Sequence, residues 1–296
     1  MKILVVGTVC NVSRQLERDL KRVSRGLKSY AEIHYDLVES DSEDTTISLL
    51  QEKVSIDPKF RFISLGSLRN KIPNRIERIR YCRNVYIQEI RNTFEEQHWD
   101  YVVVADLDGM NRALTKKCIK STFASDVQWD AAFANQSFGY YDLYALRAET
   151  WLEEDCFVTL ERMKIQKLKV ESNRKGFGKF IADFKHFDAL RVAAIYGKML
   201  VIDRNEEWIP VKSAFGGLGI YKTQLFLQHN YDFLDLEIGI YSEHIDFHQK
   251  CTSNGFKLYI NPALINSRVN EYNLNRIKVV RFIRELLKRY PIIRWN

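Results

Sequence analysis

Short apolar runs alternate with amphipathic segments through the first 110 residues. The runs are too short for buried helices and are rich in Val, Ile, Phe and Tyr, so each predicts a strand. The predicted strands lie at residues 2–6, 31–38, 60–65 and 101–105. Helices are predicted at 13–29, from 46 to 53 and at 75–97, the first with an apolar face of Leu16, Leu20, Val23 and Leu27. This alternation predicts an α/β fold with a mostly parallel sheet flanked by helices.

The carboxyl ends of the four strands should form one rim, where open α/β sheets bind ligands. Polar segments stand at all four ends. GTVCN follows the first run, ESDSEDTT the second, a segment rich in Arg the third, and DLDGMN the fourth. We therefore expect the functional site at this rim.

The fourth run ends in two carboxylates, Asp106 and Asp108. Residues two apart in an extended segment point to the same side, so both acids would face one point and favour a bound cation. Glu39 can accept hydrogen bonds from a base or ribose, and the arginines suit phosphates, so the set fits a nucleotide diphosphate with a divalent cation. The alternative for the Asp pair is a solvated or capping loop.

The composition is that of a folded globular protein. Of the 296 residues 46% are apolar, which is enough for one large domain or two small ones. No apolar run approaches the roughly 18 residues of a membrane span, and the apolar start is too short for a signal peptide. The five scattered Cys show no C-x-x-C spacing, which argues against a zinc site. We expect a cytoplasmic protein, with peripheral attachment to the inner face of the membrane as an alternative.

That alternative comes from the tail at 276–296, which carries most of the net charge of +7. Apolar residues recur there at helical spacing among basic ones, namely Ile277, Val280, Ile283, Leu287 and Tyr290. The pattern predicts a basic amphipathic helix. Such a helix either packs on the domain with its charges solvated or contacts an anionic membrane surface. Nucleic acid is not expected as a partner, because no RNA-binding or zinc-finger motif is present.

Two segments of the first half resemble a known family. VESDSEDTT, at 38–46, resembles the strand-end signature of family 2-like glycosyltransferases, with Glu39 in the first acidic position. The Arg-rich helix with Arg78, Arg83 and Asn84 resembles the donor-side helix of capsule mannosyltransferase-like proteins. The D-x-D motif follows at the expected distance. The resemblance implies a GT-A glycosyltransferase fold, which is a Rossmann-like mixed sheet, here with a C-terminal amphipathic helix.

In the second half, three blocks resemble bacterial polysaccharide glycosyltransferases: WDAAFANQSFGYYDLYALR, VKSAFGGLGIYK and SEHIDFHQKC. The resemblance divides one domain into a nucleotide-sugar half at 1–128 and an acceptor half at 129–275. It is interrupted by an insertion at about 152–205 that is rich in basic residues. One departure lies in the first signature, where Ser40 and Asp41 replace the usual Asp-Gly. Which carboxylate meets the base, Glu39 or Asp41, is therefore open.

The resemblance implies that Asp106 and Asp108 hold Mn²⁺ or Mg²⁺ against the diphosphate of a nucleotide sugar. Asp108 would be the direct ligand, and Asp106 would reach the ribose or a metal-bound water. His244 and His248 are candidates for a further metal ligand, since residues four apart share one helical face. The alternative for each His is an ordinary core histidine with a satisfied hydrogen bond.

Catalysis is assigned to the SEHIDF segment, where Glu243 is the candidate base and Asp246 the second candidate. Glu243 would instead touch the sugar if the enzyme retains configuration, or would only favour the helix N-terminus. Gly216 and Gly217 are assigned to the donor sugar pocket, with a packed turn as the alternative. Asp142 and Arg147 would bind sugar hydroxyls or form a buried ion pair with each other.

These observations predict a metal-dependent glycosyltransferase. It would move a sugar from a nucleotide diphosphate sugar to a glycan or lipid-linked saccharide acceptor, in the synthesis of a surface polysaccharide. Two alternatives belong to other classes. A nucleotidylyltransferase of sugar phosphates would need a Gly-rich basic loop after the first strand, which GTVCNVSR lacks. A non-catalytic nucleotide-sugar-binding protein would be expected to have a broken D-x-D motif, and here the motif is intact.

Overall fold

The strands of the described residues form one mixed sheet. The computed structural model describes residues 1–166, 175–232 and 242–289. In chain order the strands are β1 (Lys2–Val9), β2 (Glu32–Glu39), β3 (Phe60–Ser64), β4 (Tyr101–Ala105), β5 (Ala131–Gln136), β6 (Ile209–Pro210), β7 (Leu218–Lys222) and β8 (Leu258–Ser267). Their order across the sheet is β3-β2-β1-β4-β7-β5-β8-β6. The predicted α/β class is therefore confirmed.

The four predicted strands are all present, and β1 pairs in parallel with both β2 and β4. β2 pairs in parallel with β3. The four carboxyl ends therefore lie along one edge, as the alternation predicted. Beyond β4 the sheet becomes mixed, because β7 runs antiparallel to both β4 and β5. One continuous sheet thus joins the two halves of the chain.

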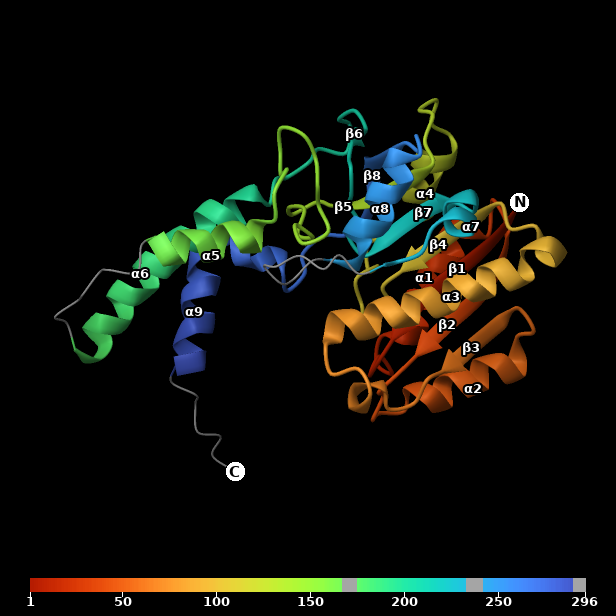
Figure 1. Cartoon of the computed structure of the whole chain (residues 1–296), viewed down its shortest axis with the longest axis horizontal. Helices are drawn as coiled ribbons and strands as arrows, with labels where there is room; N and C mark the ends of the chain where they lie inside the picture. The colour runs from red at the N-terminus through yellow and green to blue at the C-terminus, as the bar shows by residue number, and fades with distance from the viewer. Residues whose placement is uncertain (167–174, 233–241, 290–296) are drawn as a thin grey trace.

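Helices cover both faces of this sheet (Figure 1). Those around the sheet are α1 (Leu16–Leu27), α2 (Thr46–Ile56), α3 (Arg75–Gln97), α4 (Lys116–Phe123), α7 (Gln224–Gln228) and α8 (Glu243–Ser253). Side chains of α3 and α8 join the apolar core on one face, while those of α1 and α4 join the core on the other. The predicted apolar face of α1 is wholly buried.

Three helices stand to one side of the sheet as an arm (Figure 1). They are α5 (Cys156–Gln166), α6 (Gly176–Ala194) and α9 (Lys278–Arg289). The predicted insertion at 152–205 thus supplies two helices of the arm, and its residues 167–174 lie outside the described residues. α9 is the helix predicted in the tail, of which residues 290–296 lie outside the description. Among the described helices, none has the length and apolar character needed to cross a membrane.

Candidate active site

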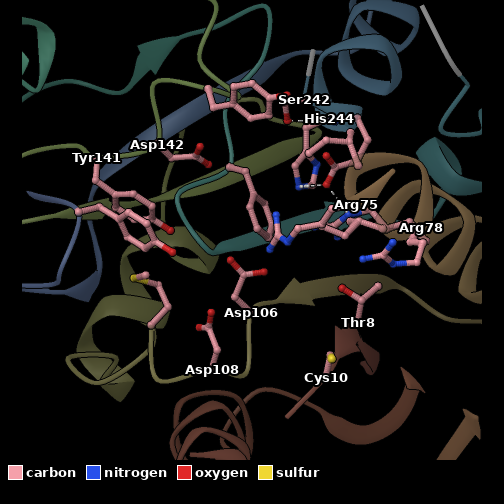
Figure 2. Close-up of a pocket in the computed structure, with 18 of the residues that line it drawn as sticks. Thr8, Cys10, Arg75, Arg78, Asp106, Asp108, Tyr141, Asp142, Ser242 and His244 are labelled. Carbon is pink, nitrogen blue, oxygen red and sulfur yellow. Dashed lines mark hydrogen bonds and ion pairs between the residues drawn. The ribbon is translucent and has the colours of Figure 1, made fainter. Parts of the chain in front are cut away.

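A cavity of about 570 Å³ opens at the predicted rim, beyond β1, β2 and β4. Figure 2 shows Asp106 and Asp108 on one side of it, with Arg75 and Arg78 across from Tyr141. Sequence-predicted residues that line it are Asp41, Arg78, Arg83, Asp106, Asp108, Asp142, Glu243 and His244. Residues 160 positions apart in the chain therefore meet in one pocket. Asp41, Asp106 and Asp108 come from the predicted strand ends, and Glu243 and His244 come from the SEHIDF block.

The loop that carries the two aspartates is held from several sides. Leu107 is buried between them, so both carboxylates turn toward the pocket. The amide nitrogen of Asp106 donates to the carbonyl oxygen of Gly217 at 3.0 Å. The Asn111 side chain donates to the carbonyl oxygen of Asp106 at 2.6 Å. The carboxylate of Asp19, from α1, accepts from the amide nitrogen of Gly109 at 2.6 Å.

Both carboxylates of the pair have raised pKa values. Burial raises the pKa of Asp106 to about 7, and the negative charge of Asp108 adds to this, while Arg83 opposes it. Burial also raises the pKa of Asp108. Burial is the main cause of both shifts, and a divalent cation bound there would favour the charged form of both carboxylates. Among the described residues no group of three His, Cys, Asp or Glu could hold a metal. Two carboxylates with phosphate oxygens and water are a set that suits Mg²⁺.

The second strand end places Asp41, and not Glu39, in the pocket. Glu39 is fully buried and accepts hydrogen bonds from the Ser64 hydroxyl at 2.5 Å and the Ser42 amide at 2.9 Å. Asp41 has a left-handed backbone, with φ of 61°, and its carboxylate lies 3.3 Å from Nε of Arg78. Glu39 therefore braces the turn. Of the two acids, Asp41 lines the pocket, where its carboxylate also accepts a hydrogen bond from the Arg69 amide at 2.8 Å.

Arg83 and Glu243 form an ion pair at the floor of the pocket. Nε of Arg83 lies 2.8 Å from Oε1 of Glu243, and both side chains are at least nine-tenths buried. The guanidinium also donates to the Tyr86 hydroxyl at 3.1 Å and lies over the ring of Phe215. Its geometry is thus fixed before any ligand binds. Asn84, the next residue, faces away and does not line the pocket; its amide bonds both the carbonyl and the amide nitrogen of Tyr231.

The two histidines differ in what surrounds them. Both ring nitrogens of His248 are engaged, Nδ1 with the Ser213 hydroxyl at 3.0 Å and Nε2 with the Tyr221 hydroxyl at 3.1 Å. Burial, followed by the positive charge of Arg83, lowers the pKa of His248 to about 3. This is the core histidine of the alternative interpretation. It lies outside the pocket, and its prediction as a metal ligand has no support in this geometry.

His244 lines the pocket and stacks on Phe215, with ring centroids 4.1 Å apart. It is buried, yet neither ring nitrogen has a hydrogen-bond partner. Burial lowers its pKa well below the ordinary value. Buried polar atoms are nearly always hydrogen-bonded in folded proteins, so this ring is an exception; its Nε2 lies 3.8 Å from Oε1 of Glu243.

Three further residues of the predicted site, Asp142, Arg147 and Asp246, have clear partners in the structure. Asp142 and Arg147 do not form an ion pair with each other: Arg147 pairs with Asp155 at 2.8 Å, and Asp142 accepts from the Gly216 amide at 2.9 Å. Asp142 lines the pocket and Arg147 does not. Asp246 also lies outside the pocket and pairs with the amine of Lys250 at 2.7 Å.

The two glycines lie behind the aspartate loop and not on the pocket surface. Both have positive φ, 69° at Gly216 and 82° at Gly217. A Cβ on Gly217 would come within 2.6 Å of the Met110 side chain, and one on Gly216 within 2.8 Å of the Ala134 carbonyl. They are needed for close approach of the backbone and not as walls of a sugar pocket, which matches the packed turn of the alternative interpretation.

Some residues of the pocket carried little signal in the sequence. Arg75 and Ser242 line it, the first within the Arg-rich segment that pointed to phosphates and the second beside Glu243. Tyr272 lines it as well and stacks on Tyr141, with centroids 5.2 Å apart and planes at 16°. The segment around Tyr272 showed no motif, and only the fold brings it to the rim.

A search of solved structures found similar folds at low identity. The mannosyltransferase PcManGT from Pyrobaculum calidifontis, in complex with GDP-Man and Mn²⁺, has 13% identity and a TM-score of 0.46 over 97% of this chain and 64% of that one. S. aureus TarS 1-349 in complex with UDP-GlcNAc has 13% identity and a TM-score of 0.47, over 97% and 67%. The chain therefore spans less than two thirds of the mannosyltransferase.

A third structure is glucosyl-3-phosphoglycerate synthase from Mycobacterium tuberculosis in complex with UDP, at 11% identity and a TM-score of 0.34, over 96% of this chain and 79% of that one. At this degree of similarity the activity of the chain rests on its own residues. Neither a scan against protein-family models nor a search of curated proteins found a match.

Proposed function

We propose that the chain is a glycosyltransferase that moves a sugar from a nucleotide diphosphate sugar to a hydroxyl group of a glycan or lipid-linked saccharide. The observation that supports this most is the convergence of Asp106 and Asp108, whose pKa values are raised, with the buried ion pair of Arg83 and Glu243 in one cavity. Its volume of about 570 Å³ lies within the range of ordinary ligand pockets.

The donor would lie along the rim from β2 to β4. Asp41 would bind the base or ribose, and Arg75 and Arg78 from α3 would bind the phosphates; all three line the pocket. Asp106 and Asp108 would hold a divalent cation, Mn²⁺ or Mg²⁺, which when bound neutralises charge on the diphosphate. Arg83 adds a guanidinium that is fixed in place, with its charge partly offset by the ion pair with Glu243. Preorganised charges of this kind stabilise a leaving group where its charge develops.

The sugar and the acceptor would meet between this rim and α8. Glu243, Asp142 and the ring nitrogens of His244, which have no hydrogen-bond partner, are among the polar groups there that could bond sugar hydroxyls. We assign Glu243 as the base that takes the proton of the acceptor hydroxyl as the new C–O bond forms. In a retaining reaction the same carboxylate would bond a hydroxyl of the sugar instead. A role in surface polysaccharide synthesis is part of the proposal and rests on the sequence resemblance.

Turnover tests the proposal. Purified protein is incubated with a panel of nucleotide sugars that includes GDP-mannose and UDP-GlcNAc, with Mn²⁺, Mg²⁺ or EDTA, and released nucleoside diphosphate is measured. We expect release from at least one donor, lost with EDTA. Release of pyrophosphate, with a sugar 1-phosphate and a nucleoside triphosphate as partners, would instead indicate a nucleotidylyltransferase. Donor binding without release in the presence of acceptors would indicate a binding protein.

Glu243→Gln separates the base from the rest of the site. We expect kcat to fall about 10²- to 10⁴-fold, the usual contribution of a general base, with little change in KM for the donor. Asp246→Asn is the matched control, since Asp246 lies on the same helix outside the pocket. Unchanged kcat in Glu243→Gln would contradict the role as base.

A further inference from the structure

The outward face of α9 is apolar. A helix that packs on a protein normally buries its apolar face and exposes its charged one. Val279, Ile283 and Leu287 recur every four residues and therefore share one face. They are 64%, 47% and 44% exposed. Arg281, on the other side of the helix, is only 7% exposed. α9 therefore presents apolar side chains to the surroundings and buries a charged one.

Charged contacts hold the helix in this orientation. The guanidinium of Arg281 donates to the carboxylate of Asp188 on α6, from Nε to one oxygen at 2.5 Å and from Nη2 to the other oxygen at 3.0 Å. Glu285, the one acid of α9, faces the same helix and pairs with Arg191 at 2.9 Å. Both contacts are on the inward side. Rotating α9 to bury its apolar stripe would break them and leave Asp188 buried without a counter-charge, which is costly.

α1 shows what the same chain does with an ordinary amphipathic helix. The four apolar residues of its stripe are all buried, and its cations point outward. The two helices have comparable sequence patterns, so the exposure of the α9 stripe is a property of its place on the arm. Exposed apolar stripes flanked by cations are typical of helices that lie in a membrane interface.

We propose that the outward face of α9 binds the surface of an anionic lipid bilayer. α9 carries five cations and one acid, and Lys278, Lys288 and Arg289 are exposed beyond the two ends of the stripe. Lys288 and Arg289 each lie 3.5 Å from an acid, Glu285 and Asp183, and the positive excess of the helix still complements anionic headgroups. In Figure 1 the arm stands away from the sheet, which leaves the face free of the pocket side. The inference is independent of the proposed function, because no residue of α9 lines the pocket.

Co-sedimentation with vesicles tests the proposal on the full chain. The probes are vesicles of equal parts phosphatidylglycerol and phosphatidylcholine, and vesicles of phosphatidylcholine alone. We expect binding to the first that weakens as salt rises, and much weaker binding to the second. In Val279→Ser/Ile283→Ser the partition coefficient should fall about tenfold or more, because two apolar side chains no longer leave water.

A matched control comes from α2, where Val54 and Ile56 are 43% and 66% exposed. Val54→Ser/Ile56→Ser removes the same two side chains elsewhere and should bind vesicles within about twofold of the wild type. Equal loss in both variants, or equal binding of the wild type to both kinds of vesicle, would overturn the proposal.

Two further results would assign the stripe to another occupant. If the wild type is a dimer in sedimentation velocity and Val279→Ser/Ile283→Ser is a monomer, the stripe binds a second copy and not a bilayer. If that variant loses several degrees of Tm, the stripe is covered by the chain itself. We expect an unchanged oligomeric state and a Tm within about 1 °C of the wild type, because substitutions at exposed sites change stability little.

Discussion

At the residue scale, the aspartate loop depends on a side chain that the sequence did not single out. Asp19 lies on α1 and is buried. Its carboxylate accepts a hydrogen bond from the Gly109 amide, so it fixes the turn that follows Asp108. Burial raises its pKa to about 6, and the hydrogen bond from Gly109 opposes this shift. No motif marks Asp19, because its partner is a backbone amide 90 residues away.

We predict that Asp19→Ala weakens Mn²⁺-dependent binding of a nucleoside diphosphate severalfold, since the loop loses the acceptor that fixes it. Asp19→Asn keeps an oxygen at the same position and should retain most of the affinity. Calorimetric titration of both variants checks this. If the two variants bind equally well, Asp19 does not position the loop.

Asp36 is a second buried acid. It does not line the pocket, and it affects the stability of the fold. Burial raises its pKa to about 6, with Arg61 opposing the shift, and one of its oxygens has no hydrogen-bond partner. The ordinary pKa of Asp is lower, so the folded state holds the proton more tightly than the unfolded state. The charged form therefore costs stability, and the free energy of unfolding falls as the pH rises from about 4 to about 6.

Asp36→Asn should remove this cost. We expect the variant to be more stable than the wild type at pH 8 by up to about 3 kcal/mol, with the difference shrinking toward pH 4. Urea unfolding across this pH range measures it. A variant less stable than the wild type at pH 8 would show that the ion pair with Arg61 outweighs the burial of the charge.

At the scale of elements, the start of β7 and the aspartate loop are built as one unit. The carbonyl of Gly217 holds the amide of Asp106, and the absent Cβ of Gly217 leaves room for Met110. Gly217→Ala should therefore destabilise the fold by about 1–3 kcal/mol and weaken metal-dependent ligand binding.

Gly255→Ala is the control for that variant. Gly255 has a similar φ of 85°, but a Cβ there would meet nothing within 4 Å. Gly255→Ala should lower the free energy of unfolding only by the strain of a left-handed alanine, about 1 kcal/mol, and should not change ligand binding. Equal effects of the two variants on binding would mean that the contact with Met110 does not matter to the loop.

The elements of the first half could be predicted because local patterns specify them. The four apolar runs and the helix face of Leu16, Leu20, Val23 and Leu27 each carry their own periodicity. In the second half, β7 enters between β4 and β5, an arrangement set by pairing over long sequence separations. The residues of the site divide in the same way, into those that a local pattern marks and those that only the fold brings there. Asp106 and Asp108 stand directly after a strand, whereas Tyr272 reaches the pocket only through the fold.

In the resembling blocks, some of the predicted residues line the pocket and others do not. A block identifies a segment of the site but not the direction of each side chain. In SEHIDF, Glu243 and His244 face the pocket, while Asp246 and His248 face neighbouring elements. In the first signature Asp41 lines the pocket and Glu39 braces the turn. The orientation around a helix start or a tight turn depends on local geometry that the letters alone do not contain.

At the scale of the whole molecule, the net charge does not show where the charged residues cluster. Outside the tail the basic and acidic residues nearly cancel in number, yet cations gather around a groove between α1 and the start of α4. The groove is lined by Arg18, Lys21, Arg22, Arg25, Leu114, Thr115 and Lys116. A net charge is therefore a poor guide to where a protein attracts anions, since clusters act locally within a Debye length.

The central claim is that Asp106 and Asp108 bind a divalent cation together with a nucleoside diphosphate. Calorimetric titration of UDP and GDP into the wild type, Asp108→Asn and Asp126→Asn, with and without Mn²⁺, tests it most directly. Asp126 is exposed and outside the pocket, so Asp126→Asn is the control. We predict that Mn²⁺ tightens binding about tenfold or more in the wild type and the control, and that Asp108→Asn abolishes this gain. Equal Mn²⁺-dependent binding by Asp108→Asn would contradict the account.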